Sequence, residues 1–528
     1  MHSCLCIDEI LQNMFGHVDD TPTLGSLSLV CRAFHEPAND TLWADLPGLA
    51  PLVKCLPDEL VATPDKSYRT VTILRPPQRA EWQRFQYHAQ RVIYLTVASD
   101  EEDEFAVDQG ALRILAHHYP APFFPRLVHF EWHNWHLAEF ASLFIEPSVC
   151  ILKYIPAEVE PMRTVLARVR THAPRLQKLE FIDGIYDTLD KLHNEFSQAI
   201  LSMNDLTVLE VQYASLQRDA LLHVSRLPHL TTLSLYLTTE IDSSWHSSYW
   251  GRFPALRRLF ILPEEDRTSI ASCASFLNAL SERPKLSYLE LRPSPTLHHN
   301  DFEDLMSAIG RFERLSYLSI TFNNSRGEWG GLSIQGSTLS PLQQLSCLQN
   351  FTLSGCPVSF ESDAVQGLAA AWTCLEYLIL TSASTDLCHF RMEDLSFFSQ
   401  HCPNLRSLTV QVHAVGDDWA HRGTIRAPMR SLRYLQLYAI SISPAAEPAV
   451  ALFLAKSFPM VTISSHHPIV RYRRQLAAHE VAAMETIERL NAETQRWTTG
   501  VVLHVLDLED RAVASQKSDH AEEQLSDN

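Results

Sequence analysis

The N-terminal stretch of the chain, residues 5–46, reads LCIDEILQNMFGHVDDTPTLGSLSLVCRAFHEPANDTLWADL. Its first part has an apolar residue every three or four positions, which is one face of an α-helix, and acids in the first turn, where the helix dipole favours them. A turn signal at residues 19–23 precedes a second predicted helix, and Pro37 is predicted to open a third. The apolar positions are Ile7, Ile10, Leu11, Met14 and Phe15, then Leu24, Leu27, Val30, Cys31 and Phe34, then Leu42, Trp43 and Leu46.

Three helices in so few residues bury too little surface to be stable alone. The apolar side chains that the three helices cannot bury among themselves should therefore pack against a partner, and another protein is the expected partner.

The same residues resemble an F-box, of the kind that opens many proteins of mushroom-forming fungi. The resemblance lies in Ile10-Leu11 with Phe15, in the block from Leu27 to Phe34 and in the block from Thr41 to Leu46. It implies binding to the Skp-type adaptor of a cullin-based ubiquitin ligase. Ile7-Asp8 stands where the motif usually has Leu-Pro. By the resemblance, the motif's inward and adaptor contacts would come from Ile10, Leu11, Phe15, Leu27, Val30, Cys31, Phe34, Trp43 and Leu46.

The alternative is that these helices only cap the array of repeats that follows. Residues 49–60 join the two parts, and they are too apolar for a flexible linker, so we expect them to pack.

From about residue 68 a unit recurs irregularly: an apolar residue, then others three and five positions later. From Leu176 onward the spacing between units is 24 to 33 residues, which is the range and the L-x-x-L-x-L core of leucine-rich repeats. The first members of the units are Val92, Leu127, Val149, Leu176, Leu206, Leu230, Leu256, Leu286, Leu315, Leu348, Leu375, Leu405 and Leu432.

The last two apolar positions of a unit lie two apart, so both point to one side of a short strand. Stacked units would form a parallel sheet, and many are preceded by a proline that ends the helix before them. Between units, residues 190–203 and 270–281 have helical patterns. Residues 348–359 resemble the cysteine-type repeat often found behind F-boxes. The fold class expected is thus α/β: a three-helix F-box-like module, then a leucine-rich-repeat-like solenoid.

The expected domains are the helical module with its bridge at 1–60, the solenoid at 61–465, a helical cap at 466–500 and a largely disordered acidic tail at 501–528. Two interruptions, the acid run 100–104 and the Gly-rich stretch 323–336, read as loops.

Composition and net charge limit the classes of function that the chain can have. The 528 residues are 46% hydrophobic and 20% charged, as in folded soluble proteins, and the net charge of −19 would repel a phosphate backbone. Eleven cysteines without a Cys-x-x-Cys pair indicate reduced thiols in the cytosol or nucleus. Apolar runs long enough for a membrane span are absent, as is a secretion signal. Neither nucleic acid nor a membrane is an expected partner.

The sequence contains no nucleophile elbow, phosphate-binding loop or dinucleotide fingerprint, the motifs of common enzyme families. His129, His133 and His136 lie among tryptophans, but the repeat pattern makes the first of them part of a strand, so imidazoles at a rim are favoured over a metal site. We expect no catalytic residue, no metal and no cofactor.

The function expected is the substrate-recognition subunit of a Skp/cullin/F-box type ligase, which is not itself an enzyme and holds a target on its solenoid. The alternative is an adaptor-independent scaffold. Target contacts are expected between the apolar strand positions, at Glu180, Glu210, Glu290, Thr352 and Thr409, and these acidic and polar residues suggest a target with basic patches.

Overall fold

The computed structural model describes the chain in two compact units. The first is residues 1–236 with 249–256, and the second is residues 237–248 with 257–528. The described residues are 7–63, 70–98, 106–155, 158–181, 191–211, 215–237, 253–262, 269–280, 285–294, 299–322, 334–381, 390–412, 428–438, 453–454, 457–458, 460, 462–463 and 502–503. The predicted C-terminal helix and acid run lie outside them, as do most of the Gly-rich stretch and the tail.

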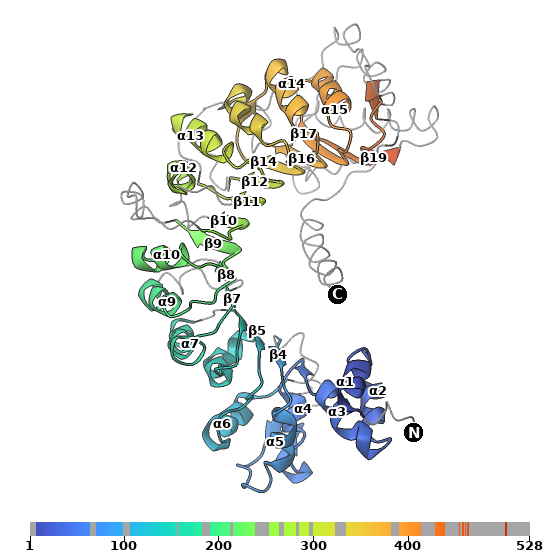
Figure 1. Cartoon of the computed structure of the whole chain (residues 1–528), viewed down its shortest axis with the longest axis vertical. Coiled ribbons are helices and arrows are strands. Elements are labelled where there is room, and N and C mark those ends of the chain that lie inside the picture. The colour runs from blue at the N-terminus through green and yellow to red at the C-terminus, as the bar shows by residue number, and fades with distance from the viewer. Residues whose placement is uncertain are drawn as a thin grey trace, which may run out of the picture. The chain divides into compact units, whose positions relative to one another are not determined.

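The first unit opens with three helices and continues as a parallel sheet covered on one side by helices (Figure 1). Its sheet runs in the order β1-β4-β5-β6-β7-β8-β9, and every neighbouring pair is parallel. The elements are α1 (Asp8–Phe15), α2 (Thr21–Ser28), α3 (Arg32–Leu42), β1 (Asp45–Leu46), α4 (Ala50–Val53), η2 (Asp58–Leu60), β2 (Val61–Ala62), β3 (Thr72–Ile73), α5 (Gln83–Ala89), β4 (Tyr94–Val97), α6 (Gln109–His118), β5 (His129–Trp132), η3 (Trp135–Phe144), β6 (Ile151–Tyr154), α7 (Val159–His172), β7 (Lys178–Phe181), α9 (His193–Ile200), β8 (Val208–Val211), α10 (Arg218–Val224) and β9 (Thr232–Tyr236).

The second unit repeats the same alternation of strand and helix (Figure 1). Its main sheet runs β10-β11-β12-β14-β16-β17-β18-β19-β20, again with parallel neighbours. The elements are β10 (Arg258–Leu262), α12 (Ile270–Ala279), β11 (Tyr288–Leu291), α13 (His299–Ile309), β12 (Tyr317–Thr321), β13 (Ile334–Gln335), η4 (Gly336–Gln344), β14 (Asn350–Ser354), β15 (Val358–Ser359), α14 (Ser362–Ala371), β16 (Tyr377–Thr381), η5 (Met392–Asp394), α15 (Leu395–His401), β17 (Ser407–Gln411), β18 (Tyr434–Tyr438), β19 (Thr462–Ile463) and β20 (Val502–Leu503).

The repeat pattern of the sequence is confirmed strand by strand. Each predicted unit has its strand at the second and third apolar positions, and the first two positions are essentially inaccessible, as at Leu176 and Leu179 (each 0% exposed). The strand register joins equivalent positions of adjacent units, for example Leu289 to Leu318 and Leu318 to Phe351. The chain is therefore a helical N-terminal module followed by a leucine-rich-repeat-like, mixed α/β array.

The predicted second and third N-terminal helices were wrong in detail. Helix α2 ends at Ser28, Cys31 is extended, and α3 begins at Arg32, so residues 24–34 are not one helix. Gly and Ser have low helix propensity, and the Ser28 hydroxyl donates to Gly25 O, which competes with helix continuation. Pro37 lies inside α3 instead of opening it, and it is buried. Packing of α3 on α1 and α2 outweighs the backbone hydrogen bond that proline removes.

The bridge predicted at residues 49–60 packs as expected. Leu49, Leu52, Val53, Leu56 and Leu60 are all buried, and the segment contains α4 and η2. The structure also has a strand that the sequence did not predict. Asp45 and Leu46 form β1, which pairs in parallel with β4 through Asp45 to Tyr94 and Leu46 to Leu95.

Candidate interaction surfaces

The three N-terminal helices enclose a small apolar core. Leu11, Phe15, Leu24 and Ala38 are buried in it, and the rings of Phe15 and Phe34 meet edge to face with their centroids 5.2 Å apart. Leu27 and Phe34 pack against this core from its margin. Of the predicted adaptor contacts, Leu11 and Phe15 therefore serve the domain's own packing.

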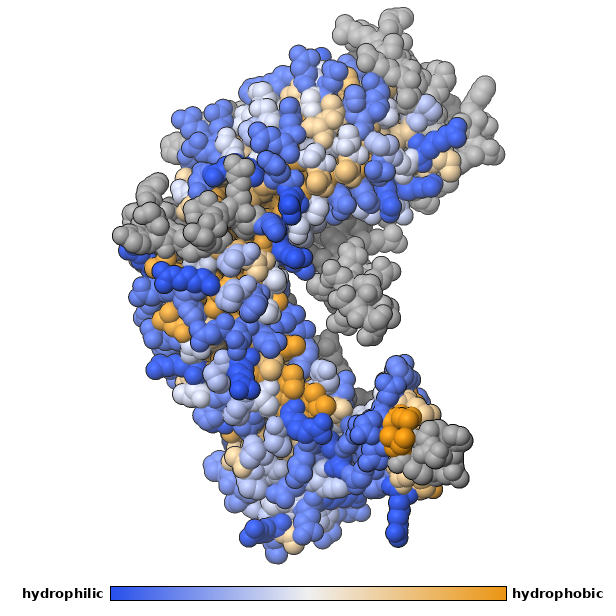
Figure 2. Space-filling view, viewed as in Figure 1, coloured by the Kyte–Doolittle hydropathy of each residue, from blue (hydrophilic) through white to orange (hydrophobic). Residues whose placement is uncertain are grey.

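The same domain leaves large apolar side chains at its surface. Leu29 is 84% exposed and Val30 61% exposed, both in the turn between α2 and α3. Orange, hydrophobic residues are visible on this domain in Figure 2. Burying one such side chain against a partner is worth about 1.5–3 kcal/mol, so covering this group would be favourable. This exposed apolar set comprises Ile7, Ile10, Met14, Leu29 and Val30.

Sequence reasoning named only part of this set as adaptor contacts. Ile10 and Val30 were predicted, whereas Ile7, Met14 and Leu29 were not. The helical spacing had placed Ile7 and Met14 on the same side as Ile10, but the contacts implied by the F-box resemblance did not include them. Cys31 and Trp43 are partly buried, and whether either touches an adaptor stays a prediction.

The N-terminal helices are joined to the first repeat by several contacts. Trp43 stacks on His88 of α5, with ring centroids 4.0 Å apart. Arg91, just after α5, pairs with Glu36 and places its Nε 2.8 Å from Asp40 Oδ1, both carboxylates being on α3. The hydroxyl of Tyr87 donates to Glu36 Oε1 at 2.6 Å.

Strand β1 extends that junction into the sheet. Leu46, a predicted adaptor contact, is only 3% exposed and sits opposite Leu95 in the ladder. Its side chain is thus part of the repeat core in this structure. Trp43 and Leu46 have the three-residue spacing of the repeat units, which is the signal that could have revealed β1.

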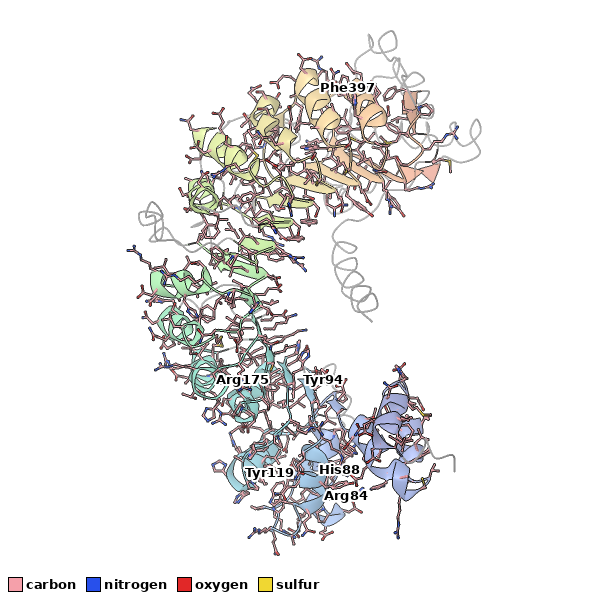
Figure 3. All side chains as sticks on the ribbon, viewed as in Figure 1. Arg84, His88, Tyr94, Tyr119, Arg175 and Phe397 are labelled. Carbon is pink, nitrogen blue, oxygen red and sulfur yellow. The ribbon has the colours of Figure 1, made fainter. Side chains whose placement is uncertain are left out.

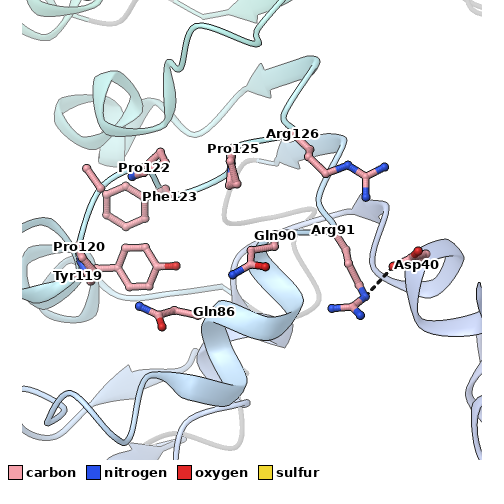
Figure 4. A pocket seen from close by; sticks show the side chains of 11 residues that line it. Asp40, Gln86, Gln90, Arg91, Tyr119, Pro120, Pro122, Phe123, Pro125 and Arg126 are labelled. Carbon is pink, nitrogen blue, oxygen red and sulfur yellow. Dashed lines mark ion pairs between the residues drawn. The ribbon is translucent and has the colours of Figure 1, made fainter. Parts of the chain in front are cut away.

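An open cavity of about 550 Å³ lies beside this junction (Figure 4). It is lined by Gln86, Gln90, Arg91, Tyr119 and Arg126, among others. Arg91 is already engaged by Asp40, and burial raises the pKa of Tyr119 to about 12, so this phenol stays neutral. Pro120, Pro122, Phe123 and Pro125 complete much of the lining, and its one carboxylate, Asp40, is paired with Arg91.

On the sheet of the first unit, the residues between the apolar positions form a charged row. The register runs from Glu131 to Lys153, then to Glu180 and Glu210. Lys153 Nζ lies 2.8 Å from Glu131 Oε1 and 3.8 Å from Glu180 Oε2, and Lys178 Nζ lies 2.6 Å from Glu180 Oε1. Glu180, a predicted target contact, is therefore largely neutralised by its neighbours.

The predicted rim histidines join the same row. His129 Nε2 is 2.6 Å and His133 Nε2 3.2 Å from the two oxygens of Glu131. Burial alone would raise the pKa of Glu131, but hydrogen bonds from His129, His133 and Lys153 outweigh it and lower the pKa. In the described part of the chain, no three His, Cys, Asp or Glu side chains are arranged to hold a metal ion.

The second unit carries the other predicted target contacts in one row. Glu290, Thr352 and Thr409 occupy the same strand position in register, with Ser319 and Ile379 between them. Glu290 Oε1 lies 2.7 Å from the guanidinium of Arg292, and the carboxylate also accepts from the hydroxyl of Tyr288. The row is thus polar, and its one carboxylate is paired. Whether Glu180, Glu210, Glu290, Thr352 and Thr409 contact a target stays a prediction.

The first three helices match a known protein family. Residues 8–46 match the F-box-like family model, so the chain carries an F-box-like domain at its N-terminus. No curated protein matches the chain. Among the described residues, none of the helices is long and apolar enough to cross a membrane.

Two solved structures similar to this chain are bacterial. An internalin (inlF) of Listeria monocytogenes has 14% identity and a TM-score of 0.39, over 72% of this chain and 89% of its own. A leucine-rich-repeat protein of Leptospira interrogans has 12% identity and a TM-score of 0.32, over 71% and 91%. At these TM-scores the two say nothing about function, and the repeat assignment rests on the strand register above.

Proposed function

We propose that the chain is the target-recruiting subunit of a ubiquitin ligase of the Skp/cullin/F-box type. The observation that carries this proposal is the exposed apolar set on an F-box-like domain. In this proposal, Ile7, Ile10 and Met14 of one helix side and Leu29 and Val30 of the turn dock on the Skp-type adaptor. The strand faces of the repeats bind the protein to be modified.

The chain itself performs no chemistry under this proposal. It raises the local concentration of a target lysine near a conjugating enzyme that the cullin assembly carries. The contacts of Arg91 and Trp43 fix the F-box-like domain on the first repeat, which favours a defined path from adaptor to target. We place this function in the cytosol or nucleus, and the resemblance to F-box proteins of mushroom-forming fungi stays a prediction.

Co-purification with the host's Skp-type adaptor tests the proposal. The variant Ile10→Glu/Met14→Glu puts charge on two exposed apolar positions of α1 and should lose the adaptor. Gln12→Glu/Asn13→Glu is the matched control, because it adds the same charge at exposed polar positions of the same helix and should retain the adaptor. Equal retention by both variants would remove Ile10 and Met14 from the adaptor contact, and failure of the wild-type chain to retain the adaptor would remove the adaptor-binding role.

A second candidate function is an adaptor-independent scaffold whose N-terminal helices only cap the repeats. The pairing of β1 with β4 favours it, because a cap has to cover the first strand's edge in this way. The scaffold needs no adaptor, so it predicts that the wild-type chain also fails to co-purify. The scaffold function does not explain why Leu29 and Val30 are exposed.

A further inference from the structure

In the second unit, basic residues gather where the strands begin. Three positions of each repeat lie there: the two that flank the first apolar residue and the first residue of the strand. We call these positions the strand-entry edge. Glu376 is the one acid at these positions, and it pairs with Arg406 at 3.4 Å. The basic residues of the strand-entry edge are Arg257, Arg258, Lys285, Arg314, Arg406 and Arg433.

The backbone stacks these positions directly on one another. The amide of Gln349 donates to Ser316 O at 2.8 Å, that of Glu376 to Gln349 O at 2.7 Å, and that of Arg406 to Glu376 O at 2.7 Å. The ladder continues from Arg433 N to Arg406 O at 2.7 Å. Neighbouring strands lie about 4.8 Å apart, so residues of adjacent repeats are side by side along the edge.

Most of the charge at this edge is open to solvent. Arg257, Lys285, Arg314, Arg406 and Arg433 are all exposed. Apart from Arg406, none of these has a described carboxylate within 4.0 Å of its charged nitrogens. This concentration of positive charge stands on a chain whose net charge is −19.

Aromatic rings line the first strand position beside the basic residues. Tyr288 and Tyr317 stack with their centroids 4.0 Å apart and their planes 5° from parallel. The guanidinium of Arg258 lies over Tyr288, 5.0 Å from the ring centroid. Further along the row, Tyr377 and Tyr434 are exposed, at 43% and 47%. Tyrosine and arginine are the residues that most often anchor protein interfaces.

We propose that the strand-entry edge of the second unit binds an acidic, extended polypeptide segment of the recruited protein. The arginines would pair with its carboxylates, and Tyr377 and Tyr434 would receive its apolar side chains. This inference rests on the proposed function for the role of the bound protein, but the binding itself does not require an adaptor. It differs from the basic target that the glutamates of the strand faces suggest.

The observations favour a polypeptide over a nucleic acid. A phosphate backbone carries continuous charge, which the acidic remainder of the chain repels. The edge instead carries its basic side chains in two groups, Arg257 to Arg314 and Arg406 to Arg433, with Asn350, Glu376 and Tyr377 between them. The side chains of a flexible acidic peptide can reach both groups, and the uncharged residues between them can hydrogen-bond to its peptide groups.

Fluorescence anisotropy of the full chain with three labelled probes tests the proposal. The probes are a polyglutamate peptide, a polylysine peptide of the same length and an oligothymidylate. We expect polyglutamate to bind more tightly than oligothymidylate near physiological salt and to weaken as salt rises, and polylysine binding not to weaken on substitution of the edge arginines. Arg257→Glu/Arg406→Glu/Arg433→Glu should weaken polyglutamate binding at least about tenfold, which corresponds to about 1.4 kcal/mol.

The matched control is Arg79→Glu/Arg170→Glu/Arg218→Glu, which makes the same charge change at exposed arginines of the first unit and should bind as the wild type does. Arg257→Gln/Arg433→Gln is a milder edge variant, in case the triple reversal does not fold, and it should weaken binding severalfold. Equal loss in the edge and control variants would overturn the proposal, since the attraction would then be diffuse. So would tighter binding of oligothymidylate than of polyglutamate. Adaptor co-purification is measured separately on the edge variant, which should retain the adaptor, so failure of either proposal is seen independently.

Discussion

Arg91 and Asp40 are 2.8 Å apart, Nε to Oδ1, and this ion pair ties the helix that ends the F-box-like domain to the first repeat (Figure 4). The arginine side chain is 10% exposed and the aspartate side chain 33% exposed. The Arg91 guanidinium also pairs with Glu36 and lies over the Tyr87 ring, 3.9 Å from its centroid. One residue thus contacts α3 twice, and its loss should loosen the junction.

Arg91→Ala should destabilise this junction by about 2 kcal/mol, the scale of hydrogen bonds to charged groups, because Glu36 and Asp40 can be rehydrated at the surface. The expected signature is faster hydrogen exchange at the amides of Ile93 and Tyr94, which donate to Ala44 O. Arg84→Ala is the control, since Arg84 lies on α5, close before Arg91 in the sequence, but is exposed (Figure 3). Unchanged exchange in Arg91→Ala would mean that the strand pairing alone holds the domain.

His88 should make the first unit sensitive to mild acid. Burial lowers its pKa from 6.5 to about 4, with help from the charges of Arg91, Arg84 and His35, while Glu36 acts the other way. The unfolded chain takes up this proton as pH falls below about 6.5, but the folded chain does not until about pH 4. Stability is therefore complete above pH 6.5 and falls between these values, by up to about 3 kcal/mol.

The variant His88→Phe isolates that effect. It keeps a ring against Trp43 and removes Nδ1, which is buried without a hydrogen-bond partner among the described residues. Urea unfolding between pH 7 and pH 4.5 should show a smaller loss of stability for His88→Phe than for the wild type. Parallel pH profiles would show that other groups account for the acid response.

Glu131→Gln should destabilise the first unit at neutral pH by about 2 kcal/mol, because its carboxylate accepts from His129, His133 and Lys153. The folded pKa of Glu131 is lowered, so its stabilisation is present above the unfolded value near 4.5 and declines as pH falls below it. The difference in unfolding free energy between wild type and variant should thus shrink in acid. Glu139→Gln changes an exposed carboxylate and should leave stability near that of the wild type at every pH.

Truncation before residue 47 should cause self-association. The deletion removes β1 and leaves β4 as an unpaired edge with exposed N–H and C=O groups, a template for pairing with other chains. Light scattering should show larger species for the truncated chain and a monomer-like size for Ile10→Glu/Met14→Glu. A truncated chain of the same size class as the full one would mean that another segment covers β4. Point variants are therefore the sharper test of adaptor binding.

Much of the fold could be predicted from the sequence, because the spacing of apolar residues within each leucine-rich repeat specifies its strand. The apolar residue that enters the core and the two on one side of the strand recur in every unit, from Val92 to Leu432. Helix positions between the strands followed for the same reason, as in α9 and α12. The spacing of Trp43 and Leu46 carried the same signal, but the resemblance to an F-box assigned both residues to another role.

The exposure of the candidate contact residues was less predictable, because it depends on which apolar side chains form the core of the domain. Leu11 and Val30 look alike in a list of F-box positions, yet one is 0% and the other 61% exposed. The net charge of the strand faces was hard to predict for the same reason. Glu180 and Glu290 read as acidic patches in sequence, but their partners Lys178 and Arg292 neutralise them only because strand geometry places side chains two residues apart on the same face.

By itself, the sequence determined the repeat register, the parallel sheet and the F-box-like start, because these follow from periodicities of two and of 3.6 residues along one chain. The tertiary structure decided what depends on contacts between distant residues. It placed Leu46 in the sheet, brought Arg91 to Asp40, and left Leu29 and Val30 in water. It also aligned the arginines of successive repeats, because strands about 4.8 Å apart set residues some thirty positions apart in sequence side by side.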